Sequence, residues 1–253
     1  MITLMGPPKV GKTIAAATLS AFFPDVLPAK EKTYLKDTVW IQFDLNGTES
    51  LSQMQVFPYL YDLSRETEYA SIQSAIASAI KEIKGNPTIK NVVIDTVTAL
   101  DTVLLVHFRK MYPEEKVQGL MYNQMLAAHM NFAMQLKQLN ATVVAITHTK
   151  MPISVSSNAD AKAAETLRKR ASSMAGGGDI VPEITGRAAN YYKGASSAVW
   201  PVVKSLGAGK RDEYWVLPYG GYGFEGGCRY EGLEDKEPAN LKNILKKVGA
   251  SYV

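Results

Sequence analysis

The segment GPPKVGKT at residues 6–13 constrains this chain most, because it matches the pattern G-x-x-x-x-G-K-[ST] without a gap. The apolar run Ile2–Met5 precedes it and a helical pattern over residues 14–22 follows it. Gly6 and Gly11 let the backbone curl so that successive N–H groups point at phosphate oxygens. The following helix adds the positive end of its dipole. The sequence therefore predicts a phosphate-binding loop between a strand and a helix; the alternative is a chance match in a glycine turn.

Two side chains of this loop have specific expected roles. Lys12 places a mobile cation against the β- and γ-phosphates, and the Thr13 hydroxyl is suited to coordinate Mg²⁺. We expect Lys12 to be an exposed loop cation that contributes little to the core. The predicted nucleotide-binding set is Gly6, Pro7, Pro8, Lys9, Val10, Gly11, Lys12, Thr13 and Ile14.

A second motif is NVVIDT at residues 91–96, an apolar strand that ends in Asp95. An acid at the carboxyl end of a parallel strand lies in the crevice where such sheets bind ligands. We therefore predict that Asp95 holds the metal's water shell beside Thr13. The alternative is an aspartate that caps a helix or closes a turn.

The apolar pattern predicts an α/β fold. Short, nearly continuous β-branched runs occur at Ile2–Met5 and at residues 39–43, 92–94 and 143–146, which is typical of parallel strands buried on both faces. Helical spacing separates them, over Tyr69–Gly85 and again from residue 121 to residue 139. We expect a mostly parallel sheet with helices on both faces.

Two regions depart from this alternation. Residues 152–182 are rich in Ser, Ala and Gly, and a connection of this length is usually functional or disordered. Residues 198–206 and 213–217 read as strands, and residues 240–248 as a short basic helix. With no clear linker, we predict one domain over residues 1–253, with a core to about residue 217 and a small β extension over about 218–253.

Composition excludes several classes of protein. No apolar run approaches the roughly 20 residues that cross a bilayer, and no signal peptide is evident. The single cysteine, Cys228, excludes an intrachain disulfide. We expect a cytoplasmic protein that does not contact a membrane. The net charge of +4 permits binding to a polyanion without arguing for it.

The fourth strand ends in Ile146-Thr147-His148, where a polar side chain would lie near the γ-phosphate. His148 is therefore predicted to sense hydrolysis and signal to the long segment that follows it. The alternative is a neutral histidine bonded to a nearby carbonyl.

In this order and spacing, GPPKVGKT, VVIDTVTAL (92–100) and VVAITHTK (143–150) resemble the RecA-like P-loop superfamily. The closest resemblance is to the short, core-only phage proteins of the Sak type, and it covers the chain to about residue 217. The resemblance implies an ATP- and Mg²⁺-dependent ATPase that binds single-stranded DNA in annealing, recombination or replication. It further implies a homo-oligomeric ring or filament, the host cytoplasm as location, and a single-strand binding protein as a candidate partner.

The resemblance also assigns residues. It places His148 at the sensor position and the DNA-binding loop over residues 150–186. Lys210 and Arg211 lie where related proteins reach across a subunit interface toward the neighbour's γ-phosphate, a cation that would stabilise phosphoryl transfer. A solvated turn between two strands is the equal alternative for these two residues.

One position departs from the superfamily pattern. Asn46 stands where a glutamate usually orients the attacking water, and an amide cannot accept a proton at neutral pH. Asp44 or Glu49 are candidates for this role. Without a substitute, hydrolysis would be slow and nucleotide would act as an assembly switch.

The case for nucleic-acid binding from the residues alone is balanced. Six cations surround the long segment, diluted by nearby acids, and no aromatic residue occurs between residues 151 and 190 to stack on bases. A solvated loop is the alternative. The candidate DNA contacts are Lys150, Lys162, Arg168, Lys169, Arg170 and Arg187.

Three other functions share the nucleotide motifs. One is a motor or regulatory ATPase that acts on duplex DNA or protein, and another is a nucleotide-gated assembly protein with little turnover. The third, a small-molecule kinase, is disfavoured because no arginine-rich lid segment is evident.

Overall fold

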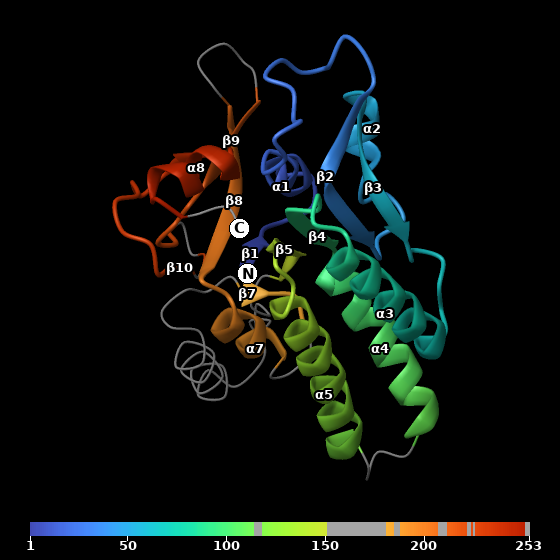
Figure 1. Ribbon diagram of the computed structural model, residues 1–253. Coiled ribbons are helices and arrows are strands. Elements are labelled where there is room, and N and C mark those ends of the chain that lie inside the picture. The colour runs from blue at the N-terminus through green and yellow to red at the C-terminus, as the bar shows by residue number, and fades with distance from the viewer. Residues whose placement is uncertain are drawn as a thin grey trace, which may run out of the picture.

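The computed structural model describes residues 1–113, 118–150, 181–184, 188–206, 212–221, 224 and 226–250. Its centre is a nine-stranded sheet in the order β11-β9-β8-β1-β5-β4-β2-β3, with β10 paired to β8 (Figure 1). A separate two-stranded ladder joins β6 (Thr149–Lys150) to β7 (Val181–Pro182).

Six neighbouring strands of the sheet run parallel. They are β3 (Val56–Asp62), β2 (Thr33–Gln42), β4 (Asn91–Asp95), β5 (Thr142–Thr147), β1 (Ile2–Met5) and β8 (Ala198–Leu206).

The antiparallel strands lie at the β8 side of the sheet and come from the end of the chain. They are β9 (Asp212–Val216), β10 (Gly227–Cys228) and β11 (Glu237–Pro238). The predicted fold class, an α/β domain with a mostly parallel sheet and a C-terminal β extension, is confirmed.

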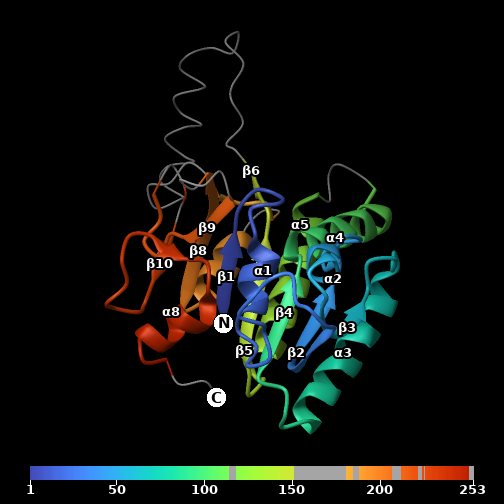
Figure 2. The same ribbon diagram turned by 90° about the horizontal axis from the view of Figure 1, so that it is seen from above.

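Helices cover both faces of the sheet (Figures 1 and 2). One face packs against α3 (Tyr69–Gly85), α4 (Val97–Met111), α5 (Gln118–Lys137) and α7 (Ala188–Ala195). The other face packs against α1 (Lys12–Ala17), α2 (Glu49–Gln53) and α8 (Leu241–Lys247).

Strand β4 shows why the apolar runs are continuous. Val92 and Ile94 belong to the core beneath α3, α4 and α5, whereas Val93 belongs to the core beneath α1 and α8. Successive side chains of a strand point to opposite faces, so a strand covered on both sides needs apolar residues at every position. The same reasoning explains β5.

Several element boundaries differ from the sequence expectation. The helix expected over residues 14–22 ends at Ala17, because the chain then turns toward β2. Asp37 holds that turn, since its carboxylate accepts hydrogen bonds from the Ser20 hydroxyl and from the Ala21 N–H, the latter at 2.9 Å. The strand expected from residue 39 begins at Thr33, and a register shift between Leu35 and Val39 interrupts it.

The carboxyl ends of four strands meet at one edge of the sheet. In the parallel register Met5 pairs with Thr147, Asp95 with Ile146, and Gln42 with Asp95. The loop after β1 and the chain after β2, β4 and β5 therefore leave the sheet side by side, as open parallel sheets require of a ligand crevice. In the described part of the chain, no helix is both long and apolar enough to cross a bilayer.

Candidate nucleotide site

The loop of residues 6–13 connects β1 to α1 in a conformation that requires glycine at two positions. Gly11 precedes the first turn of α1 with φ +88, a left-handed conformation that favours glycine. A Cβ at Gly11 would also lie 2.5 Å from the Tyr214 ring, and one at Gly6 would lie 2.7 Å from the Val202 carbonyl oxygen. Strands β8 and β9 therefore pack directly against this loop.

Lys12 is buried rather than exposed, with 5% of its surface accessible, so the expectation of an exposed loop cation was wrong. Its Nζ donates hydrogen bonds of 2.7 Å to the Gly6 and Pro7 carbonyl oxygens, which hold the ammonium inside the loop. Burial lowers the pKa of Lys12 to about 8, against the opposing effect of the Asp95 and Asp44 carboxylates.

The remaining loop residues frame this lysine. Pro7, Pro8 and Lys9 are exposed, and Lys9 has a φ of +65. Val10 and Ile14 are half-buried and pack against the core beneath α1. The loop is thus exposed at residues 7–9, and two apolar side chains, Val10 and Ile14, fix it to the core.

Asp95 and Thr13 meet across the crevice. The Thr13 hydroxyl donates to Asp95 Oδ2 at 3.2 Å, and Trp40 Nε1 donates to the same oxygen at 3.3 Å. Burial raises the pKa of Asp95 to about 7, and these two hydrogen bonds oppose the shift only in part. The residue that caps α4 is Thr96, whose hydroxyl accepts from the Ala99 N–H at 3.0 Å, so Asp95 is not a helix cap.

The chain after β2 wraps around Asp95. The N–H groups of Phe43 and Asp44 donate to the Asp95 carbonyl at 2.7 and 3.2 Å. A Cβ at Gly47 would lie 3.1 Å from Asp95 Oδ2, so the backbone there passes directly over the carboxylate.

This arrangement separates the candidates for activating water. Asp44 is half-buried and acts electrostatically on Lys12, Asp95 and His148, so it faces the site. Glu49 is exposed in the first turn of α2 and accepts a hydrogen bond from Gln53 Nε2 at 3.3 Å. Asn46 is exposed, and its N–H donates to Asp44 Oδ1 at 3.2 Å.

His148 lies directly after β5 and joins three elements. Its N–H donates to Thr98 Oγ1 of α4 at 2.9 Å, and its carbonyl accepts from the Glu183 N–H at 2.7 Å. Burial, followed by the Lys12 cation, lowers the pKa of His148 despite the opposing Asp44 and Glu183 carboxylates. The ring is therefore neutral at pH 7, beside the phosphate loop and beside the β6–β7 ladder.

Other predicted site residues lie elsewhere. Lys150 ends strand β6, which continues from the site. Outside the described residues lie Lys162, Arg168, Lys169, Arg170, Arg187, Lys210 and Arg211. Across the described ranges, no group of three or more His, Cys, Asp or Glu side chains could hold a metal ion.

The donor set at Thr13 and Asp95 fits Mg²⁺ that arrives with a nucleotide. Mg²⁺ commonly takes one or two protein oxygens and completes its shell with phosphates and water. A threonine hydroxyl and a carboxylate that share one hydrogen bond can both turn their oxygens to such an ion.

Trp40, Thr98 and Tyr214 are site residues that the sequence motifs do not reveal. Trp40 shares one face of β2 with Gln42, whose amide oxygen accepts from the Thr48 N–H at 3.0 Å. A tryptophan and a glutamine two residues apart on a buried strand could have indicated a polar site there, because the buried N–H and amide groups of these side chains need hydrogen-bond partners.

Comparison with known proteins gives a family match. The model of the AAA domain family matches residues 1–194. A search of curated proteins finds no match. Among solved structures, the RadB recombinase is similar over 85% of this chain and 86% of that chain, with 12% sequence identity and a TM-score of 0.40.

Proposed function

This chain belongs to the AAA domain family, whose members are P-loop ATPases, and from that premise we propose that it hydrolyses ATP to act on single-stranded DNA. The DNA reaction we propose is annealing, recombination or replication in a phage. The observation that supports catalysis most directly is the 3.2 Å contact between Thr13 and Asp95 beside the loop that holds Lys12.

The residues of the loop would bind the triphosphate. Lys12 is tethered by two backbone carbonyls within the loop, so its ammonium is already placed for an anion that enters there. The N–H groups at the start of α1 add the positive end of the helix dipole.

Thr13 and Asp95 would hold Mg²⁺, which neutralises charge on the phosphates when bound. Because the pKa of Asp95 is raised to about 7, part of the protein carries a protonated Asp95 at neutral pH. Trp40 keeps the carboxylate oriented in either state, since its indole N–H donates to Oδ2.

Asp44 is the residue that we propose to activate water. Its carboxylate acts on both Lys12 and Asp95, whereas Glu49 is exposed and hydrogen-bonded within α2. A carboxylate can accept a proton from water, which the amide of Asn46 cannot.

His148 would report the state of the phosphates to the DNA-binding segment. It lies between Lys12 and the β6–β7 ladder, and that ladder brackets residues 151–180 in the chain. We propose that Lys150, Lys162, Arg168, Lys169, Arg170 and Arg187 contact DNA phosphates.

Assembly into a ring or filament completes the proposal. Lys210 and Arg211 fall between β8 and β9, and Tyr214 of β9 contacts Gly11 of the phosphate loop. Cations at that end of β9 would act on the nucleotide of a neighbouring subunit.

The test is ATP hydrolysis with Mg²⁺, measured with and without a single-stranded oligonucleotide. We expect DNA to stimulate turnover, and charge reversal at Arg168-Lys169-Arg170 to weaken DNA binding and its dependence on salt. Turnover that DNA leaves unchanged would refute the action on DNA and leave the ATPase assignment standing.

One observation favours a second function. Asn46, which the resemblance aligns with the glutamate of related proteins, is exposed, and this fits a nucleotide-gated assembly protein with slow turnover. In that case ATP binding would drive oligomerisation while the rate of hydrolysis stays negligible.

A further inference from the structure

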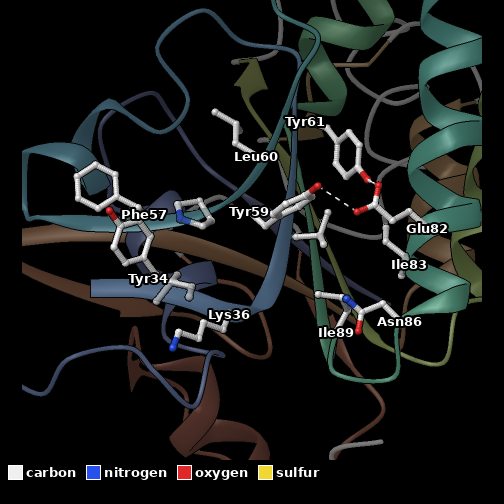
Figure 3. A pocket seen from close by; sticks show the side chains of 13 residues that line it. Tyr34, Lys36, Phe57, Tyr59, Leu60, Tyr61, Glu82, Ile83, Asn86 and Ile89 are labelled. Carbon is white, nitrogen blue, oxygen red and sulfur yellow. Dashed lines mark hydrogen bonds between the residues drawn. The ribbon is translucent and has the colours of Figure 1, made fainter. Parts of the chain in front are cut away.

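A pocket of about 470 Å³ lies at the β3 side of the sheet, among β2, β3 and the end of α3 (Figure 3). Its lining runs over β2 from Tyr34 to Val39 and over β3 from Phe57 to Tyr61, and none of these residues belongs to the nucleotide site described above. The register shift between Leu35 and Val39 opens the sheet here, and α3 ends at Gly85. The volume is within the range of small-molecule sites.

Two pairs of aromatic rings line this pocket. Tyr34 and Phe57 lie 5.7 Å apart between ring centroids at an interplanar angle of 35°, and Tyr59 and Tyr61 lie 5.5 Å apart at 74°. Tyr34 and Tyr59 are 56% and 52% exposed. Aromatic side chains of this size are usually buried in a core or an interface. The exposed rings of Tyr34 and Tyr59 therefore offer faces on which a planar ligand can stack.

A carboxylate marks one end of the aromatic surface. The hydroxyls of Tyr59 and Tyr61 both donate to Glu82 of α3, the former at 3.0 Å (Figure 3). Burial and the Glu82 carboxylate raise the pKa of Tyr61, so its hydroxyl stays protonated and donates. A carboxylate fixed in this way can accept from the exocyclic amino group of a base.

A lysine also lines the pocket. Lys36 of β2 is exposed there (Figure 3). The lining thus combines a cation, aromatic faces and an amino-group acceptor, a combination that suits a phosphate followed by a base.

The outer edge of β3 is poorly suited to a peptide strand. Leu63 donates to Gln42, and Gln55 accepts from Thr33, so odd-numbered residues of β3 direct their backbone groups toward β2. Pro58 therefore lies at an outward-facing position, where it removes a donor that an added strand would need. Among the described strands, β2 is the partner of β3 and the outer edge has none.

We propose that this pocket binds a base of single-stranded DNA, stacked on Tyr59, with its phosphate against Lys36. The inference rests on the proposed action on single-stranded DNA and supplies the aromatic contacts that residues 151–190 lack. It places a DNA contact away from the phosphate loop, so its loss leaves basal hydrolysis intact.

The test is the affinity of the full chain for a fluorescein-labelled single-stranded oligonucleotide, with 2-aminopurine emission as a direct readout of stacking. We expect Tyr59→Leu to weaken binding roughly 5- to 100-fold and to abolish quenching of 2-aminopurine. Tyr59→Phe keeps the ring and should bind like the wild type. Tyr122→Leu, an exposed tyrosine of α5, is the matched control and should also bind normally.

The outcomes separate this inference from the proposed function. If the wild type binds DNA and Tyr59→Leu binds equally well, the pocket inference is wrong and the action on DNA stands. If the wild type binds no DNA with or without ATP, both the pocket inference and the proposed action on DNA are wrong. If Tyr59→Leu changes the oligomeric state at unchanged DNA affinity, the surface is a protein interface and the inference is overturned.

Discussion

Thr13 and Asp95 are 82 residues apart in the chain, yet the Thr13 hydroxyl donates to Asp95 Oδ2 at 3.2 Å. The parallel pairing of β1 with β5 and of β5 with β4 brings the two strand ends together. One strand therefore separates the loop that we propose to bind phosphate from the acid that we propose to hold the metal.

Asp95→Asn should lower the rate of ATP hydrolysis and raise the stability of the fold. Hydrolysis should fall at least about 100-fold, because the charged metal ligand is lost. Without Mg²⁺ at pH 8, the free energy of unfolding should rise on the order of 1–3 kcal/mol, because the buried carboxylate of the wild type is ionised.

The pH dependence of that stability difference has a defined sign. Folding raises the pKa of Asp95 from 3.8 to about 7. Protonation of Asp95 therefore contributes fully to the free energy of unfolding of the wild type below pH 3.8, and this contribution is lost as the pH rises through 7. The gap between variant and wild type should thus open across this window in urea titrations. A gap that stays constant from pH 4 to pH 8 would show that Asp95 does not titrate as described.

Asp44 and Glu49 offer a matched pair for the residue that activates water. Asp44→Asn should lower kcat roughly 100- to 10,000-fold, the range of a general base, with ATP affinity little changed. Glu49→Gln should stay within a few-fold of wild type, because Glu49 is exposed and bonded to Gln53. The reverse ranking in steady-state kinetics would transfer the role to Glu49.

His148→Ala should uncouple DNA from hydrolysis. The backbone contacts to Thr98 and Glu183 remain in the variant, so the fold and the basal rate should be retained within a few-fold. Stimulation of hydrolysis by single-stranded DNA should be lost, while DNA affinity measured by anisotropy is unchanged. Full stimulation in the variant would remove His148 from the signalling role.

The sequence predicted the parts of the site that local motifs specify. The residues of the phosphate loop, and Asp95 at a strand end, follow from glycine conformation and from the position of an acid after an apolar run. Their mutual approach followed from the parallel fold class. These features depend on neighbours in the chain, or on a rule common to all parallel sheets.

Contacts between distant segments could not be predicted in this way. Lys12 is buried with its ammonium bonded to two backbone carbonyls of its own loop, and β8 and β9 contact that loop at Gly6 and Gly11. Tyr214 meets Gly11 because β8 joins the sheet beside β1, a pairing that no local pattern encodes. Strand β3 was also not predicted from the sequence, because Pro58 and the exposed tyrosines leave it without the continuous apolar run of a buried strand.

The end of the chain offers a test of stability that is independent of catalysis. Lys247 Nζ and the Glu234 N–H donate to Glu237 Oε1 at 2.6 and 2.8 Å. Although burial opposes it, these contacts lower the pKa of Glu237, so its stabilising effect is present at neutral pH and is lost as the pH falls through the lowered pKa.

Glu237→Gln should therefore cost about 1 kcal/mol of unfolding free energy at pH 7, the typical value of a buried hydrogen bond. The difference from wild type should shrink in acid, as the wild-type carboxylate becomes protonated. Lys246→Gln on the exposed side of α8 serves as the control. Equal stability of Glu237→Gln and wild type at pH 7 would show that this contact does not anchor α8.

Steady-state ATP hydrolysis by wild type and Lys12→Ala, each with Mg²⁺, tests the central claim most directly. The wild type should turn over ATP and stop when EDTA removes the metal. The Lys12→Ala protein should remain folded by circular dichroism, since it loses a desolvated cation, and should show no hydrolysis above background. Retained turnover in a folded Lys12→Ala protein would contradict the assignment of residues 6–13 as the nucleotide site.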